Sequence, residues 1–236
     1  MAPTSSALAP APDATSPSPS RRRIADGPTD AEVLSRPEKQ WRWIREATDD
    51  TCRARLRDTA ARFIGLPDRD EPNGNGCGIP RAVALIRGAT GVRYQPAIRV
   101  DCSFALRLGE IETLMHEEAE ARFGARVRAV GTIGSYACRD VRGRLRGWSG
   151  GISEHSFGNA VDVTHFDLDD GQRISVARHY PRDRKPAARP PGAFLRRVVA
   201  RVWDEADMRA LSPDFDRSHA GHLHFDAGSR WWRRGR

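Results

Sequence analysis

Apolar residues recur at two spacings along the chain, and these spacings predict a mixture of helices and strands. Spacings of three and four, typical of amphipathic helices, occur in residues 50–64, 101–123 and 194–203. Short apolar or alternating runs, typical of strands, occur in residues 82–86, 127–133, 160–166, 173–176 and 223–226. Asp169-Asp170-Gly171 is a turn signal between two of these strands, so we expect a hairpin there. Helices mixed with antiparallel hairpins predict an α+β fold.

The two ends of the chain differ in composition from its middle. Residues 1–40 are rich in proline, alanine and serine, which predicts a disordered tail. We expect one folded domain over residues 41–230 and a basic tail at 231–236. No apolar run reaches the about 18–20 residues of a membrane helix. The first 20 residues also lack the apolar stretch of a secretory signal, so the sequence leaves the export route open.

The chain is basic, with a formal net charge of +8 that comes almost wholly from arginine. A basic surface favours anionic partners such as nucleic acids, acidic cell-wall polymers or lipid head groups. The sequence contains no ribonucleoprotein-type motif and no basic helix with interleaved aromatic residues. We therefore expect no nucleic-acid partner, and the oligomeric state stays open.

Two short segments together predict a zinc site. The first, Ser153-Glu-His-Ser-Phe-Gly-Asn-Ala-Val-Asp162, places His155 and Asp162 on either side of a glycine that can turn the chain. The second is His222-Leu-His224, whose histidines a strand would point to the same face. Each segment alone is common in proteins without a metal, but both in this order favour a metal site. Imidazole and carboxylate are normal zinc ligands, so His155, Asp162 and one of His222 or His224 would supply three.

The motifs resemble those of a known family, the bacterial extensin-like C-terminal domain. The resemblance covers residues 52–226 and rests on four segments: Cys77-Gly-Ile-Pro80, Gly134-Ser-Tyr-Ala-Cys-Arg139, residues 153–162 and residues 219–226. A cysteine-led helix at Cys102 also matches. The two histidine motifs are similar, more distantly, to the zinc metallopeptidases grouped around lysostaphin, the D-alanyl-D-alanine carboxypeptidases and the hedgehog fold.

This resemblance implies a fold, a metal and an activity. The expected fold is a small antiparallel sheet that carries the metal site and is flanked by helices. The implied zinc ligands are His155, Asp162 and His224, and the implied reaction is hydrolysis of peptide bonds in peptidoglycan stem or cross-bridge peptides. Arg139 occupies the place of a substrate-binding arginine in the wider group.

One departure from the wider group concerns the catalytic base. Many of its carboxypeptidases carry an acidic residue three positions before the last ligand, where this chain has Gly221. The base would then be His222, or else His219 or Asp216. A non-catalytic cell-wall-binding module with a structural or degenerate zinc site is the alternative. We assign no role to the remaining histidines, which are His116, His165 and His179.

The four cysteines, Cys52, Cys77, Cys102 and Cys138, show no Cys-x-x-Cys spacing, which disfavours a structural zinc or a redox pair. Two disulfides would indicate an oxidising compartment. Together with the family resemblance this predicts a periplasmic or extracellular protein, while four buried thiols in the cytosol remain the alternative. Of the three possible connectivities we expect Cys52–Cys77 and Cys102–Cys138.

Overall fold

The computed structural model describes residues 49–70, 77–139, 153–181, 187 and 189–228. Within these residues it confirms the α+β class, with a mostly antiparallel sheet and a few helices. The predicted tails at 1–40 and 231–236 and a predicted loop at 140–151 lie outside the described residues. No helix in the described ranges is long and apolar enough to cross a membrane.

The described residues form helices and strands that are mixed along the chain. The helices are α3 (Asp49–Arg57), α4 (Cys102–Phe123), α5 (Val176–His179) and α6 (Pro190–Asp204), with two short 3-10 helices, η1 (Glu154–Phe157) and η2 (Arg217–His219). The strands are β1 (Arg62–Gly65), β2 (Arg69–Asp70), β3 (Gly78–Ile79), β4 (Ala82–Arg87), β5 (Arg93–Asp101), β6 (Val127–Gly134), β7 (Ala160–Leu168), β8 (Arg173–Ser175), β9 (Arg209–Leu211) and β10 (Leu223–Asp226).

The main sheet has the strand order β1-β4-β5-β6-β7-β10-β9, and β8 pairs with β7. Among the strand pairs of the described residues, only β5–β6 is parallel. Strand β7 is central because its first half pairs with β10 and its second half with β8. Residues near β10 and residues near β7 are therefore brought together at the same edge of β7.

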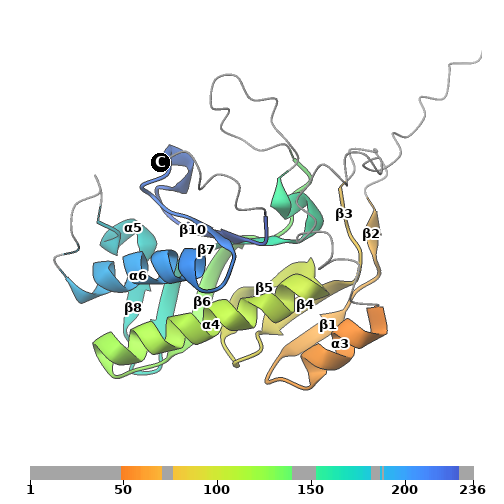
Figure 1. Cartoon of the computed structure of the whole chain (residues 1–236), viewed down its shortest axis with the longest axis horizontal. Helices are drawn as coiled ribbons and strands as arrows, with labels where there is room; N and C mark the ends of the chain where they lie inside the picture. The colour runs from red at the N-terminus through yellow and green to blue at the C-terminus, as the bar shows by residue number, and fades with distance from the viewer. Residues whose placement is uncertain (1–48, 71–76, 140–152, 182–186, 188, 229–236) are drawn as a thin grey trace, which may run out of the picture.

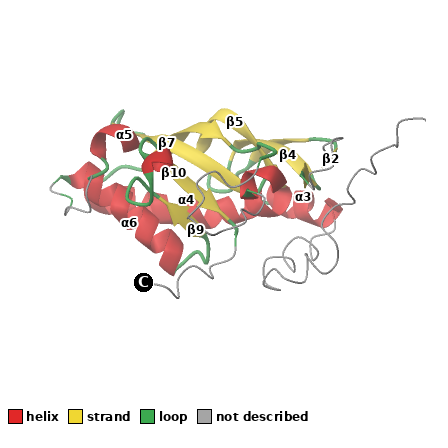
Figure 2. Cartoon of the chain, turned by 90° about the horizontal axis from the view of Figure 1, so that it is seen from above, coloured by secondary structure: helices red, strands yellow, loops and turns green. Residues whose placement is uncertain are grey.

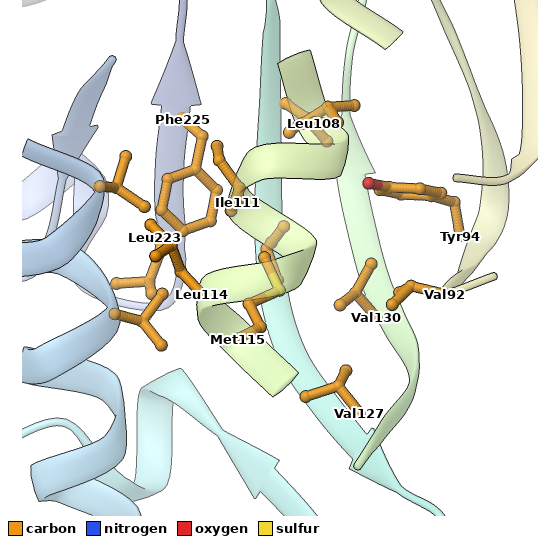
Figure 3. Close-up of a cluster of buried hydrophobic side chains, with 14 of the residues drawn as sticks. Val92, Tyr94, Leu108, Ile111, Leu114, Met115, Val127, Val130, Leu223 and Phe225 are labelled. Carbon is orange, nitrogen blue, oxygen red and sulfur yellow. The ribbon is translucent and has the colours of Figure 1, made fainter. Parts of the chain in front are cut away.

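Helices α4 and α6 lie together on one face of this sheet (Figures 1 and 2). Asp101 caps the start of α4 through a bond from the Ser103 N–H, and Gly124 ends it in a left-handed conformation. Figure 3 shows Leu223 and Phe225 of β10 packed against Ile111 and Leu114 of α4. This packing fixes which face of β10 is apolar and leaves its alternate residues for the other face.

Most predicted elements are confirmed, including the β7–β8 hairpin, but one predicted helix is too long and several short elements and strand β5 were missed. The helix predicted over residues 50–64 ends at Arg57, and Phe63 and Ile64 belong to β1, which pairs with β4. Strand β5 was missed because Pro96 and several charged residues interrupt its apolar pattern. Tertiary pairing overrides local propensity at both places.

The predicted disulfide connectivity is wrong. The bonds are Cys52–Cys102 and Cys77–Cys138, with Cα–Cα distances of 6.1 and 5.6 Å. Helix α3 packs on α4, which brings Cys52 to the first residue of that helix. Cys77 precedes β3 and meets the segment that follows β6. The pairing follows the packing of distant elements rather than proximity in sequence.

Candidate metal centre

Two neighbouring strands carry two residues of the expected zinc set. Asp162 on β7 and His224 on β10 are direct partners in an antiparallel ladder. Because the residues flanking His224 point into the core, its side chain projects from the opposite face, beside that of Asp162. Side chains of directly opposite residues lie about 5 Å apart at Cβ. The sheet register therefore brings this pair together.

His155 reaches the same place from η1, just before β7. Gly158 ends η1 with a φ of +66°. A Cβ at this position would lie 2.8 Å from the backbone nitrogen of Asp101. Glycine thus permits a close approach in which the Asp101 N–H donates to the Gly158 carbonyl at 3.0 Å. This turn places His155 beside Asp162.

The three side chains converge on one point and are all buried. His155 Nε2 lies 3.1 Å from His224 Nδ1 and 3.3 Å from Asp162 Oδ2. His224 Nδ1 lies 2.9 Å from Asp162 Oδ1. In the part of the chain that the structure describes, these residues form a cluster with metal-binding geometry, because their ligand atoms lie within 4.8 Å of one another.

This geometry fits a zinc ion. Zinc bonds of about 2.0–2.2 Å in a tetrahedral arrangement place neighbouring ligand atoms about 3.3 Å apart. The separation of the two nitrogens, and the distance from each nitrogen to the nearer, different oxygen of the Asp162 carboxylate, differ from that value by a few tenths of an ångström. The two imidazole nitrogens facing each other compete for a single hydrogen-bonding proton, whereas a cation would satisfy both of them and the carboxylate. The donor set is also one that zinc prefers.

A buried carboxylate orients His224. Its Nε2 lies 2.5 Å from Asp226 Oδ2, and Asp226 in turn accepts bonds from Arg209 Nε at 2.8 Å and the Gly228 N–H at 2.7 Å. A carboxylate on the second ring nitrogen fixes the tautomer and orientation of a ligand histidine. Here it places the hydrogen on Nε2 and directs Nδ1 toward Asp162 and His155.

Burial and hydrogen bonding set the protonation of these groups. Burial lowers the pKa of His224, but hydrogen bonds to Asp162 and Asp226 outweigh it and raise this pKa to about 9. Burial raises the pKa of Asp162, yet bonds from His155 and His224 hold it far below its ordinary range. Burial is likewise outweighed at Asp226, where the Arg209 charge is the largest influence that lowers the pKa. A zinc ion bound here would have to displace the proton that His224 holds.

The raised pKa of His224 predicts an opposite pH dependence for zinc-free and zinc-loaded protein. Without zinc, the proton on His224 stabilises the fold fully below pH 6.5, and this contribution is lost as the pH rises through about 9. A shift of this size corresponds to about 3 kcal/mol. With zinc, deprotonation favours the metal, so the added stability grows with pH. Urea unfolding between pH 6 and 10, with and without chelator, measures both trends.

The matched control for this pH dependence is His224→Gln. The zinc-free variant should show no loss of unfolding free energy across the same pH range beyond what other groups produce. A wild-type profile that is flat, or that His224→Gln reproduces, would contradict the assignment.

Two further histidines lie beside the cluster. His222 Nε2 is 3.6 Å from Asp162 Oδ1, and the His219 ring centroid is 5.1 Å from that of His222. Burial is the largest of the effects that lower the pKa of His222, so its imidazole is neutral at pH 7. His219 Nδ1 lies 2.7 Å from Asp216 Oδ1, at the start of η2. The structure thus gathers all three sequence candidates for the base at one edge of the centre.

Arg139 is tied to η1 by its backbone. Its N–H donates to Ser156 Oγ at 3.0 Å, and its carbonyl accepts the Ser153 N–H at 3.1 Å. The neighbouring Cys138 is bonded to Cys77. The backbone position of Arg139 is therefore fixed relative to η1, the segment that carries His155.

Sequence reasoning gave no role to two residues of the centre, Asp226 and Arg209. Asp226 had a usable signal, since it lies two residues after His224 and so on the same strand face. Arg209 had none, because it reaches Asp226 only through the β9–β10 pairing. His116 lies apart, bonded to Thr90 beside Glu112, and His165 and His179 line a cavity on the other side of Gly221.

Comparison with known proteins gives a single match. A family model described as the C-terminus of extensin-like proteins matches residues 50–236, which include every residue of the candidate centre. No curated protein and no solved structure matches the chain.

Proposed function

The chain belongs to the extensin-like C-terminal family, and we propose that it is a zinc-dependent peptidase acting on peptidoglycan stem or cross-bridge peptides. The observation that carries this proposal is the spacing of His155, Asp162 and His224 as three corners of a tetrahedral zinc site. Three protein ligands leave a fourth position for water or substrate, as in catalytic rather than structural zinc sites. The resemblance of both histidine motifs to lysostaphin-type and D-alanyl-D-alanine peptidases supports the substrate class.

The residues around the cluster suit proton transfer. Bound zinc supplies Lewis-acid chemistry, which polarises a carbonyl and acidifies water. His222, neutral at pH 7 because of its lowered pKa, can accept a proton as general base. The Asp216 carboxylate accepts a hydrogen bond from the Nδ1–H of His219. The Nε2 of His219 is then free of hydrogen and can accept a proton, as in the histidine–aspartate pairs of other hydrolases. We assign His222 as the base and His219 as a second proton acceptor.

Arg139 is the proposed substrate-binding residue. A guanidinium can hold a carboxylate with two parallel bonds or polarise a carbonyl oxygen. The Cys77–Cys138 bond and the Ser156 hydroxyl fix the backbone that carries it. A backbone held in this way suits a substrate-binding residue, because it limits the positions that the Arg139 side chain can reach.

The proposed location is the periplasm or the cell exterior. The two disulfides support it, because such bonds form and persist in oxidising compartments. The substrate is found in the same place.

A cell-wall-binding module with zinc as a structural element is the second candidate. Gly221 favours it, because an acidic base is missing where the related peptidases keep one. The two functions differ in whether the protein releases new fragments from the wall.

Digestion of purified sacculi separates the two functions. The zinc-loaded protein is expected to release peptide fragments that mass spectrometry identifies and that disappear with chelator. His222→Ala should keep its zinc and lower the rate by about 100- to 10,000-fold, the usual contribution of a general base. His219→Ala should cause a smaller loss, because it removes only the second acceptor.

The outcomes assign the function directly. An unchanged fragment profile from protein with one zinc per chain would exclude the peptidase and favour the binding module. Full activity in His222→Ala with loss in His219→Ala would transfer the role of base to the Asp216–His219 pair.

A further inference from the structure

A cavity of about 450 Å³ lies next to the metal centre, on the side of β8 and α5. The lining residues are Thr164, His165, Arg173, Ser175, Ala177, Arg178, His179 and Gly221. Its volume is within the range of small-molecule sites. None of the three cluster residues and neither proposed proton acceptor lines this cavity, so the proposed function gives it no role.

The cavity and the centre are close in sequence on two segments, because Thr164 follows Asp162 by two residues on β7 and Gly221 directly precedes His222. Leu223 is opposite Val163 at the end of the ladder, so His222 and Thr164 lie directly beyond this last pair. Thr164 lies two residues from Asp162, or about 7 Å along the strand. A Cβ on Gly221 would meet no atom within 4 Å, so the space beside this residue is open. A peptide held at the centre could therefore reach the cavity within two or three residues.

The lining is cationic and rich in hydrogen-bond donors. It includes two arginines and two histidines but no carboxylate. Asp167 accepts hydrogen bonds from Nε and Nη2 of Arg173, at 2.6 and 2.9 Å, so Nη1 is the Arg173 nitrogen that a ligand could use. The exposed guanidinium of Arg178 makes no hydrogen bond or ion pair within the described ranges.

The two histidines are held in defined tautomers. His179 Nδ1 accepts the Ser175 N–H at 3.0 Å, so the ring hydrogen of the neutral form is on Nε2 and available to a ligand. The Thr164 hydroxyl donates to the Gly131 carbonyl, so its oxygen accepts from His165 Nδ1 at 3.0 Å. Gly131 permits this arrangement, because a Cβ there would lie 1.9 Å from the His165 ring. In this arrangement His165 and Thr164 offer no hydrogen to a ligand. The donors that match an anion are His179 Nε2, Arg173 Nη1 and the guanidinium of Arg178.

We propose that this cavity binds a carboxylate carried by the substrate, a few residues from the bond at the metal centre. The inference rests on the proposed function for the identity of the substrate, but the anion site itself does not require catalysis. Stem peptides carry free carboxylates, and charge-assisted bonds to arginine are among the strongest in proteins. Inorganic phosphate shares this chemistry and is the competing source of the anion.

The test is calorimetric binding to zinc-free protein, which separates it from any failure of peptidase activity. The probes are a stem pentapeptide with free carboxylates, the same peptide with those carboxylates converted to amides, and inorganic phosphate. We expect the amidated peptide to bind about tenfold more weakly, equivalent to about 1.4 kcal/mol. Arg178→Glu should abolish the difference between the two peptides.

The matched control is Arg55→Glu, which makes the same change of charge at an exposed residue of α3, beside β1 at the far end of the sheet (Figure 1). This variant should keep the full preference for the free acid. Equal binding of the two peptides, or equal loss in both variants, would overturn the proposal. Binding of phosphate but not peptide, lost in Arg178→Glu, would assign the cavity to a separate anion and overturn its link to the substrate.

Discussion

Replacing His224 with alanine is expected to leave the protein without zinc and without activity. The change removes one of the three proposed ligands, and the fully buried Asp226 carboxylate then keeps, among the described residues, Arg209 and the Gly228 N–H as partners. Loss of a residue that merely orients a ligand typically costs 10- to 100-fold in metal affinity. We therefore expect loss of a ligand to cost more than about 100-fold. Zinc content after dialysis, and competition with a chromophoric chelator, measure the effect.

Two further variants serve as controls for His224→Ala. Asp226→Asn keeps all three ligands but replaces the carboxylate that orients His224, so its zinc affinity should fall by about 10- to 100-fold. His222→Ala should bind zinc as tightly as the wild type, because no ligand changes. One zinc per chain in His224→Ala, or equal zinc loss in His222→Ala, would contradict the ligand assignment. Circular dichroism of each variant establishes that it is folded.

The cluster of His155, Asp162 and His224 could be predicted in part because its chemistry lies in two short local segments. Residue type and spacing pointed to His155, Asp162 and one of His222 or His224, and only the family resemblance favoured His224. Arg209 could not be predicted, since its contact with Asp226 depends on which strand becomes the neighbour of β10. The cavity at Arg178 depends in the same way on the β7–β8 hairpin and the loop before His222.

The fold divides along the same physical line. Helix α4 and strands β4, β6, β7 and β10 have patterns that burial alone explains, and each was predicted. Strand β5 contains Pro96, whose missing N–H breaks a ladder, and only its pairing with β4 and β6 defines it. The disulfides were wrong for a related reason: a bond between Cys52 and Cys102 requires α3 to pack on α4.

Removing the Cys52–Cys102 disulfide is expected to lower stability by about 2–4 kcal/mol. Its cysteines are separated by 50 residues, a loop for which the chain-entropy model gives about 4 kcal/mol. Both side chains are fully buried, so alanine at these positions adds a small packing loss. For a chain of this size the melting temperature should fall by about 10 °C. Thermal unfolding of Cys52→Ala/Cys102→Ala measures this change.

Cys77→Ala/Cys138→Ala is the matched control, because its separation of 61 residues makes the entropic loss nearly the same. The two bonds differ in what they hold. Cys102 is the first residue of α4 and is part of the hydrophobic core. Cys138 precedes Arg139, whose backbone N–H donates to Ser156, the residue after His155. Both variants should therefore lose similar stability, but Cys77→Ala/Cys138→Ala should weaken zinc and substrate binding more, at temperatures where both variants are folded. Equal binding losses in both variants would mean that the disulfides support the metal centre only through overall stability.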